Sequence, residues 1–170
     1  MNHFACKPIG LIRSPFHEAR GTPIQPPMAA DVEGSVELFE EYAAGLKDLD
    51  GFDRIWLVYW FDRTEWLGDL VVTPFLDAIP RGLFATRAPS RPNRIGLSSV
   101  RLVSVEGNRL NVRGLDVLDR TPLLDIKPYV ARFDCFVSAR AGWLDTATSD
   151  RTVADGRFEH SPPKGRDSSS

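Results

Sequence analysis

A stretch rich in arginine and turn residues lies near the middle of the chain, at residues 83–97. The surrounding segment 78–105 has no aspartate or glutamate, although it contains the arginines Arg81, Arg87, Arg91, Arg94 and Arg101. Pro89 and Pro92 restrict the backbone and remove amide donors, so we expect a stiff loop rather than a helix. Guanidinium groups on such a loop can hold phosphate or carboxylate oxygens in fixed geometry. A solvated loop that makes surface salt bridges is the alternative interpretation.

Two other groups of charged side chains could contribute chemistry. In the segment Asp-Ile-Lys-Pro-Tyr at 125–129, Asp125 and Lys127 share one face if the segment is a strand, since side chains alternate. Segment 114–122 places two carboxylates beside a turn, those of Asp116 and Asp119. A surface ion pair is the alternative for the first group, and a turn cap for the second.

Composition limits the class of protein. The chain has 170 residues, 42% hydrophobic and 26% charged residues, and a formal net charge of -2, values typical of one globular domain. Because the whole chain is slightly acidic, any contact with a polyanion has to come from a local patch such as the arginine loop.

The cysteines, histidines and apolar runs argue against a disulfide-rich, a metal-binding or a membrane protein. Cys6 and Cys135 are too far apart for a disulfide framework, and we expect both to be buried thiols of a cytoplasmic protein. His3, His17 and His160 show no ligand spacing, so we expect no metal site. We also expect no membrane contact, since no apolar run is long enough to cross a bilayer and no signal-peptide pattern is present.

Hydrophobic patterning predicts a mainly β protein. Apolar and polar residues alternate in several short segments that glycine or proline separates. Residues 55–61 form an apolar run, which predicts a strand over 53–61 that is buried on both faces. A short helix is expected over 39–46 and an extended loop over 21–27. The other predicted strands cover 7–16, 32–38, 71–75, 96–105, 109–112, 123–127 and 131–138.

These strands predict a small antiparallel β-barrel, closed or partly open, with one or two short helices. A Rossmann fold is disfavoured because strands do not alternate with long helices and no Gly-x-Gly-x-x-Gly follows a strand. We expect the barrel domain over 1–142, a C-terminal extension over 143–160, and a disordered tail rich in serine and proline over 161–170.

Several motifs together resemble the YaeB/TsaA-like family, which is the family of the tRNA methyltransferase TrmO. In order, they are Pro-Ile-Gly-Leu-Ile-Arg-Ser-Pro-Phe at 8–16, Gly-Thr-Pro-Ile-Gln at 21–25, Phe-Ala-Thr-Arg at 84–87, Arg-Pro-Asn-Arg-Ile-Gly-Leu at 91–97 and Asp-Ile-Lys-Pro-Tyr at 125–129. The resemblance implies a β-barrel, S-adenosylmethionine as methyl donor, and a homodimer whose interface builds the cofactor sites. In the characterised branch the product is an N6-methylated threonylcarbamoyladenosine beside the tRNA anticodon.

Carried over residue by residue, the resemblance also implies site residues. An arginine would hold the methionine carboxylate, a carboxylate the ribose hydroxyls, and one residue would act through its backbone. The implied cofactor-binding residues are Ile24, Gln25, Asp62, Arg63, Arg87, Leu97 (through its backbone), Gly114, Leu115 and Asp116. Those on the substrate side are Arg91, Asn93, Arg94, Lys127 and Tyr129, with Asp125 chosen to accept the N6 proton.

The chain departs from the family pattern at three points. Asp62-Arg63 stands where many relatives carry His-Gln, and Arg120 stands where glycine is usual before Thr-Pro. We also expect the chain to lack the additional C-terminal domain of longer bacterial members, so that any tRNA would be held differently. The leading hypothesis is a cytoplasmic, dimeric tRNA methyltransferase. The alternatives are a sensor that binds S-adenosylmethionine without catalysis and a methyltransferase for a small-molecule acceptor.

Overall fold

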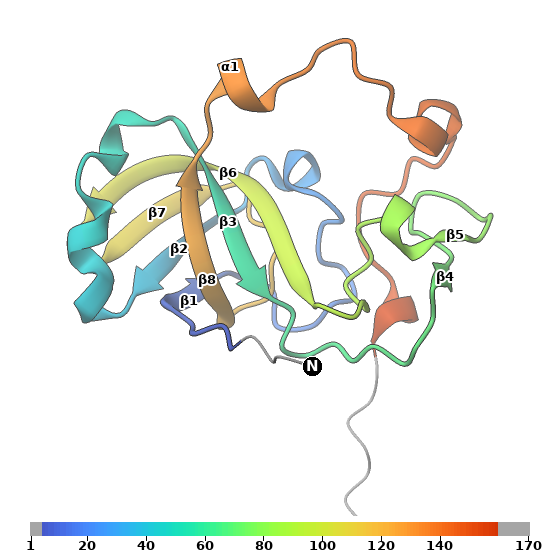
Figure 1. Cartoon of the computed structure of the whole chain (residues 1–170), viewed down its shortest axis with the longest axis horizontal. Helices are drawn as coiled ribbons and strands as arrows, with labels where there is room; N and C mark the ends of the chain where they lie inside the picture. The colour runs from blue at the N-terminus through green and yellow to red at the C-terminus, as the bar shows by residue number, and fades with distance from the viewer. Residues whose placement is uncertain (1–4, 160–170) are drawn as a thin grey trace, which may run out of the picture.

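A closed antiparallel barrel forms the centre of the computed structural model, which describes residues 5–159 (Figure 1). Its strands neighbour one another in the order β1-β2-β7-β6-β3-β8. Their bounds are β1 (Gly10–Arg13), β2 (Glu33–Leu38), β3 (Arg54–Trp60), β6 (Ile95–Glu106), β7 (Arg109–Arg113) and β8 (Thr121–Pro128). The predicted barrel is therefore confirmed, and closure removes the exposed edges that an open sheet would leave.

Side chains that point into the barrel form the hydrophobic core. On β3, Ile55, Leu57 and Tyr59 are at most 3% exposed, whereas the residues between them are only half-buried. The prediction that β3 is buried on both faces was wrong, because a barrel strand has only one inner face. The apolar run led to this wrong prediction because the outward residues, Trp56, Val58 and Trp60, are also apolar.

A register shift in β8 decides which way its charged residues face. Tyr59 pairs with Leu123, but Val58 pairs with Asp125, so Leu124 is an additional residue at a bulge. After the bulge, Asp125 lies opposite the outward residue Val58. Such an extra residue reverses the alternation of the side chains that follow it.

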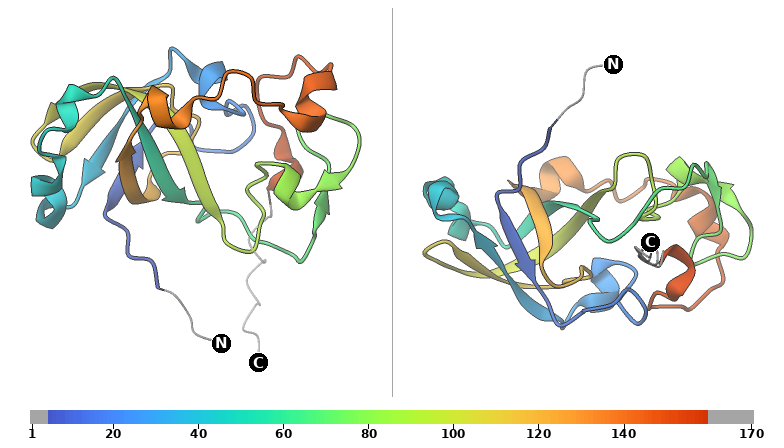
Figure 2. Two further views of the ribbon diagram at one scale, coloured as in Figure 1. Left: turned by 45° about the horizontal axis from the view of Figure 1, so that its top comes forward. Right: turned by 90° about the horizontal axis from the view of Figure 1, so that it is seen from below.

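Short helices and loops lie mainly beyond the two ends of the barrel (Figures 1 and 2). The predicted helix over 39–46 is a 3-10 helix, and the predicted strand over 71–75 is limited to two residues. The elements are η1 (Pro26–Ala29), η2 (Glu40–Leu46), η3 (Leu49–Gly51), β4 (Val71–Val72), β5 (Arg81–Gly82), η4 (Leu83–Ala85), α1 (Ala131–Asp134), η5 (Gly142–Thr146) and η6 (Gly156–Phe158).

Two predictions near the chain ends were wrong. Residues 131–138 form no strand; α1 covers Ala131–Asp134 and every side chain of 131–138 is exposed, because the barrel closes without them. Cys6 and Cys135 are exposed rather than buried, since both lie outside the barrel strands. The expected disordered tail, 161–170, lies outside the described residues.

Gly96 allows β6 to pass closely over the ring of Tyr59. A Cβ atom at position 96 would lie 2.1 Å from Tyr59 Cε2, and this ring is buried with its hydroxyl bonded to Ser98. We expect Gly96→Ala to lower the free energy of unfolding by about 2 kcal/mol through overpacking. Urea denaturation measures this, with Gly82→Ala as control because a Cβ there meets no atom within 4 Å. Equal midpoints for the two variants would contradict the expectation.

Candidate functional site

A chain of hydrogen bonds from the barrel interior ends on Asp116. The Tyr59 hydroxyl and Ser98 Oγ lie 3.0 Å apart, and Ser98 Oγ donates to Asp116 Oδ1 at 2.6 Å. Since the serine has a single proton and it goes to the carboxylate, the tyrosine donates to the serine. Both inner residues are almost fully buried, so they hold the carboxylate in one orientation. Its remaining acceptor capacity can serve a ligand.

Asp116 is electrostatically unusual for an aspartate. Burial raises its pKa to about 6, while the Ser98 hydrogen bond and the positive charge of Arg87 act in the opposite direction. Burial also raises the pKa of Tyr59, and the negative charge of Asp116 adds to this effect. A carboxylate that loses its proton near neutral pH beside a guanidinium is typical of a binding or catalytic site.

Two loops that are distant in sequence meet beside Asp116. Arg87, from the loop after η4, donates from Nη1 to Gln25 Oε1 at 2.6 Å. The Arg87 side chain is exposed, so most of its five donors remain accessible. The structure thus brings together Gln25, Arg87 and Asp116, which we call the barrel-end site.

Other predicted cofactor residues surround this site in different ways. Ile24 is half-buried next to Gln25, and Gly114 has the left-handed φ of 90° that favours glycine. Leu115 is fully buried in the core, so its side chain is unable to contact a ligand. Leu97 lies within β6 with an outward side chain that is 51% exposed.

The arginine loop is stiff because its own arginines bond to backbone carbonyls. Arg91 Nη1 donates to Ala88 O at 3.4 Å, and Arg94 donates to Thr64 O while it stacks 4.8 Å from the Trp60 ring centroid. Asn93 is exposed in the turn before β6. Arg91 and Arg94 therefore shape the loop, whereas Arg87 points its guanidinium at the barrel-end site.

The family departures also have structural partners. Arg63 donates to the backbone oxygen of Asp119, and it lies 3.9 Å from the carboxylate of Asp62. Arg120 takes the left-handed φ of 64°, the conformation that the usual glycine would adopt more easily. Asp62 and Arg63 thus lie beside the 119–120 turn; no bond joins them to Gln25, Arg87 or Asp116 among the contacts of the described chain.

Asp125, Lys127 and Tyr129 lie apart from the barrel-end site. Asp125 and Lys127 form an ion pair with 2.7 Å between Nζ and Oδ2, on the outer face of β8. Tyr129 packs on Trp56 of β3, with 5.6 Å between the ring centroids. The three residues face the outside of the barrel wall, and within one chain they make no contact with Gln25, Arg87 or Asp116.

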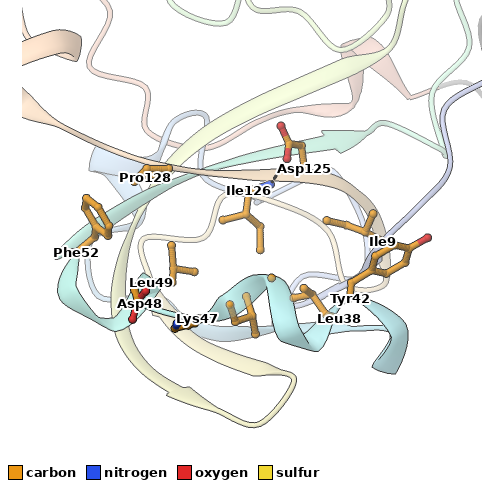
Figure 3. Close-up of a pocket in the computed structure, with 12 residues that line it drawn as sticks. Ile9, Leu38, Tyr42, Lys47, Asp48, Leu49, Phe52, Asp125, Ile126 and Pro128 are labelled. Carbon is orange, nitrogen blue, oxygen red and sulfur yellow. Dashed lines mark hydrogen bonds between the residues drawn. The ribbon is translucent and has the colours of Figure 1, made fainter.

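An apolar pocket of about 450 Å³ lies beneath η2 and η3. Figure 3 shows Ile126 pointing into it, while Asp125 lies at its rim with the carboxylate directed away. Its remaining walls come mainly from Ile9, Leu38, Tyr42, Leu46, Leu49 and Phe52. Lys47, Asp48 and Asp125 add charged groups to its lining. The pocket does not contain the residues of the barrel-end site.

Sequence reasoning missed Tyr59 and Ser98. Tyr59 was assigned to the core with the rest of its apolar run, and a single serine in a strand carries no distinctive pattern. The alternation of inward and outward side chains along the two strands could have identified both residues, since each falls on an inward position. Within residues 5–159, no three His, Cys, Asp or Glu side chains are grouped to hold a metal ion. No helix in this part of the chain is long and apolar enough to cross a membrane.

Comparisons with known proteins assign the family. A protein of Pyrococcus abyssi named "Probable S-adenosyl-L-methionine-binding protein" is 50% identical over 154 residues, covering 89% of this chain and 83% of its own length. The mouse tRNA (adenine(37)-N6)-methyltransferase is 36% identical over 134 residues, 75% of this chain but 31% of that enzyme.

A solved structure agrees with the sequence matches. The crystal structure of TrmO from P. aeruginosa superposes with a TM-score of 0.71 at 39% identity, over 85% of this chain and 63% of that one. The chain thus spans less than two thirds of the length of that protein. The sequence model of the tRNA-methyltransferase O N-terminal domain matches residues 11–135. The chain therefore belongs to the family of the tRNA-methyltransferase O N-terminal domain.

Proposed function

We propose that the protein is an S-adenosylmethionine-dependent methyltransferase that acts on the N6 atom of threonylcarbamoyladenosine in tRNA. The carrying observation is the meeting of Gln25, Arg87 and Asp116, which come from three separate motifs, at one end of the barrel. The relatives' names support both parts of the proposal, since one names S-adenosyl-L-methionine and another names adenine 37 of tRNA.

The charges of the barrel-end site fit this cofactor. Arg87 carries exposed guanidinium donors for the methionine carboxylate, and Asp116 offers carboxylate oxygens to the ribose hydroxyls. Gln25, held against Arg87, would bind beside them, with Ile24 and the backbone of Gly114 lining the adenosine. When bound, the cofactor supplies an activated methyl group on a positively charged sulfur. The residues would then act mainly by orienting it, since methyl transfer needs an in-line geometry.

A homodimer would bring the outer residues into the reaction. Asp125, Lys127 and Tyr129 are on the outer wall of their own barrel, where apolar side chains are exposed: Ile95 is 42% and Leu97 51% exposed. Surface of this kind is typical of an interface. In the proposed dimer, this wall faces the barrel-end site of the partner. Asp125 would accept the N6 proton, and Lys127 would attract the threonylcarbamoyl carboxylate.

The arginine loop would bind the tRNA backbone. The guanidiniums of Arg91 and Arg94 stay half-buried against backbone oxygens, and each keeps further donors for phosphate. Asn93 lies between them at an exposed turn. A cytoplasmic location follows from the proposed substrate. If these contacts hold RNA, its affinity will fall steeply with salt concentration.

A sensor that binds S-adenosylmethionine without turnover is the second candidate. It is favoured by the replacement of His-Gln by Asp62-Arg63 and by the backbone bond from Arg63 to Asp119. Arg63 lies beside the Asp62 carboxylate and bonds to the backbone of Asp119, so in the sensor the two side chains bind one another and this turn and not an acceptor. Product formation separates the two functions, because a sensor makes no S-adenosylhomocysteine.

The decisive experiment is transfer of labelled methyl groups from S-adenosylmethionine to total tRNA by the purified 170-residue chain. We expect label in tRNA that contains threonylcarbamoyladenosine and none in tRNA prepared without it. Asp125→Asn is expected to lose most of this activity while it retains cofactor affinity by calorimetry. Cofactor binding with no label in either tRNA pool would reject the tRNA methyltransferase and leave the sensor or a methyltransferase for a small-molecule acceptor.

A further inference from the structure

The chain returns to the barrel-end loops after a long excursion. Residues 131–141 are exposed throughout, so they carry the chain away from the barrel without packing on it. Residues 142–159, which we call the returning segment, then contain η5 and η6 and lie on the side of the molecule that holds η4, β4 and β5 (Figures 1 and 2). This segment begins after residue 135, where the match to the family model ends.

On one side, the returning segment pairs with the loop that carries Gln25. Gly21 N donates to Ala154 O at 2.9 Å, Ala154 N donates to Thr22 O at 2.8 Å, and Ile24 N donates to Thr152 O at 3.0 Å. Pro23 forms a β-bridge with Val153 in the centre of this contact. The backbone immediately before Gln25 is thus held by a short two-stranded ladder.

On the other side, Trp143 binds η4, directly before the loop that carries Arg87, and Arg157 binds the connection between β4 and β5 that leads into η4. Trp143 Nε1 donates to Ala85 O at 2.7 Å, two residues before Arg87. Arg157 Nη1 donates to Pro74 O at 2.7 Å, and its guanidinium lies 5.2 Å from the ring centroid of Phe75. The same segment therefore contacts the backbone near both residues of the Arg87–Gln25 hydrogen bond.

Arg157 is itself fixed in place within the returning segment. Its Nε and Nη2 atoms donate to the two carboxylate oxygens of Asp155, at 2.9 and 2.7 Å. The hydrogen bonds and charges of Arg157 lower the pKa of Asp155 to about 2, so this pairing persists at any pH where the protein is assayed. A planar arginine held in this way presents its remaining donors in a constant direction.

We propose that the returning segment is a positioning element for the cofactor site, with Trp143 and Arg157 as its positioning residues. This inference rests on the proposed cofactor binding at Gln25, Arg87 and Asp116. Gln25 and Arg87 themselves lie in irregular backbone, between β1 and η1 and after η4, so the contacts of the returning segment reduce the conformations open to the backbone beside each of them. The segment restricts both loops before the ligand arrives, which removes an ordering cost from binding.

The test uses full-length variants that weaken the contacts of the returning segment and leave every barrel residue unchanged. Trp143→Phe keeps an aromatic ring but removes the indole donor, and Arg157→Met keeps the stem but removes the guanidinium. We expect the double variant to bind S-adenosylmethionine about 10-fold more weakly in calorimetry, with the melting temperature of the barrel unchanged. In the ligand-free protein, amides 20–25 and 84–88 are expected to exchange with deuterium about 10-fold faster.

Trp66→Phe is the matched control. Its indole donates to Asp69 O at 3.0 Å, a bond of the same kind that joins neither cofactor loop. We expect this variant to match the wild type in both measurements. Unchanged amide exchange in the Trp143/Arg157 variant overturns the positioning role. Faster exchange with no cofactor binding even by the wild type would leave the positioning of the loops intact and reject the proposed function instead.

Discussion

Arg87→Ala is expected to weaken binding of S-adenosylmethionine about 100-fold, which corresponds to about 3 kcal/mol. The guanidinium is the exposed cation of the barrel-end site, and its Nη1 already donates to Gln25 Oε1 at 2.6 Å. Without it, the proposed methionine carboxylate would lose a charge-assisted partner. Because the side chain is exposed and lies outside the core, the free energy of unfolding should stay within about 0.5 kcal/mol.

Calorimetric titration measures the affinity, and Arg101→Ala is the matched control. Arg101 comes from the same acid-free stretch of sequence but is exposed on β6, away from Gln25 and Asp116. We expect Arg87→Lys to fall between the wild type and the alanine variant, since lysine keeps the charge but lacks the planar fork. An affinity for Arg87→Ala within twofold of the wild type would remove this residue from the site.

Asp116→Asn is expected to abolish the pH dependence of cofactor binding and to lower its affinity at pH 7.5 about 30-fold, or about 2 kcal/mol. The folded-state pKa of Asp116 is about 6, and the ionised form is the better acceptor for ribose hydroxyls. Wild-type affinity should therefore decrease about 10-fold for each pH unit below 6. The asparagine variant should show a flat profile over the same range.

The same substitution, Asp116→Asn, weakens cofactor binding but should not lower the free energy of unfolding. Burial raises the pKa of Asp116 from 3.8 to about 6, so folding penalises its ionised form. The penalty is absent below about pH 3.8, grows as the pH rises to 6, and is complete above it, at most about 3 kcal/mol. At pH 7.5 the asparagine variant should therefore be at least as stable as the wild type. Its amide oxygen can still accept from Ser98 Oγ.

Denaturation at pH 7.5 and pH 5 measures this effect, with Asp31→Asn as control because Asp31 is exposed. We expect the stability advantage of Asp116→Asn over the wild type to be smaller at pH 5 than at pH 7.5. A large loss of stability at pH 7.5 would show that the carboxylate is a structural group rather than a strained binding group. Arg87→Ala should also move the wild-type binding profile to higher pH, since Arg87 lowers the pKa of Asp116.

Local patterns in the chain were sufficient to predict the barrel. The alternation of apolar and polar residues located β1, β2, β6, β7 and β8 to within a few residues, because one face of each strand has to be buried. The apolar run located β3 as well, but its burial on both faces was predicted wrongly because the outward side chains Trp56, Val58 and Trp60 are also apolar. The alternation failed at 131–138, where apolar residues are exposed rather than packed.

Family motifs predicted which residues to examine but not how they are grouped. Gln25, Arg87 and Asp116 come together at one end of the barrel, while Asp125, Lys127 and Tyr129 lie on the outer wall. A single additional residue, Leu124, decides that separation, since the bulge sets the phase of everything after it in β8. No periodicity in the sequence reveals a bulge whose cause lies in the pairing with a neighbouring strand.

By itself, the sequence therefore determined the strand pattern, the barrel class and the family, because these depend on residue types along the chain. The tertiary structure alone decided three features: the Tyr59–Ser98–Asp116 chain, the outward direction of Asp125, and the contacts of residues 142–159 with the backbone beside Gln25 and Arg87. Each of these depends on contacts between segments far apart in sequence. Such contacts form only when the closed barrel fixes the register of its strands and the positions of the loops at its end.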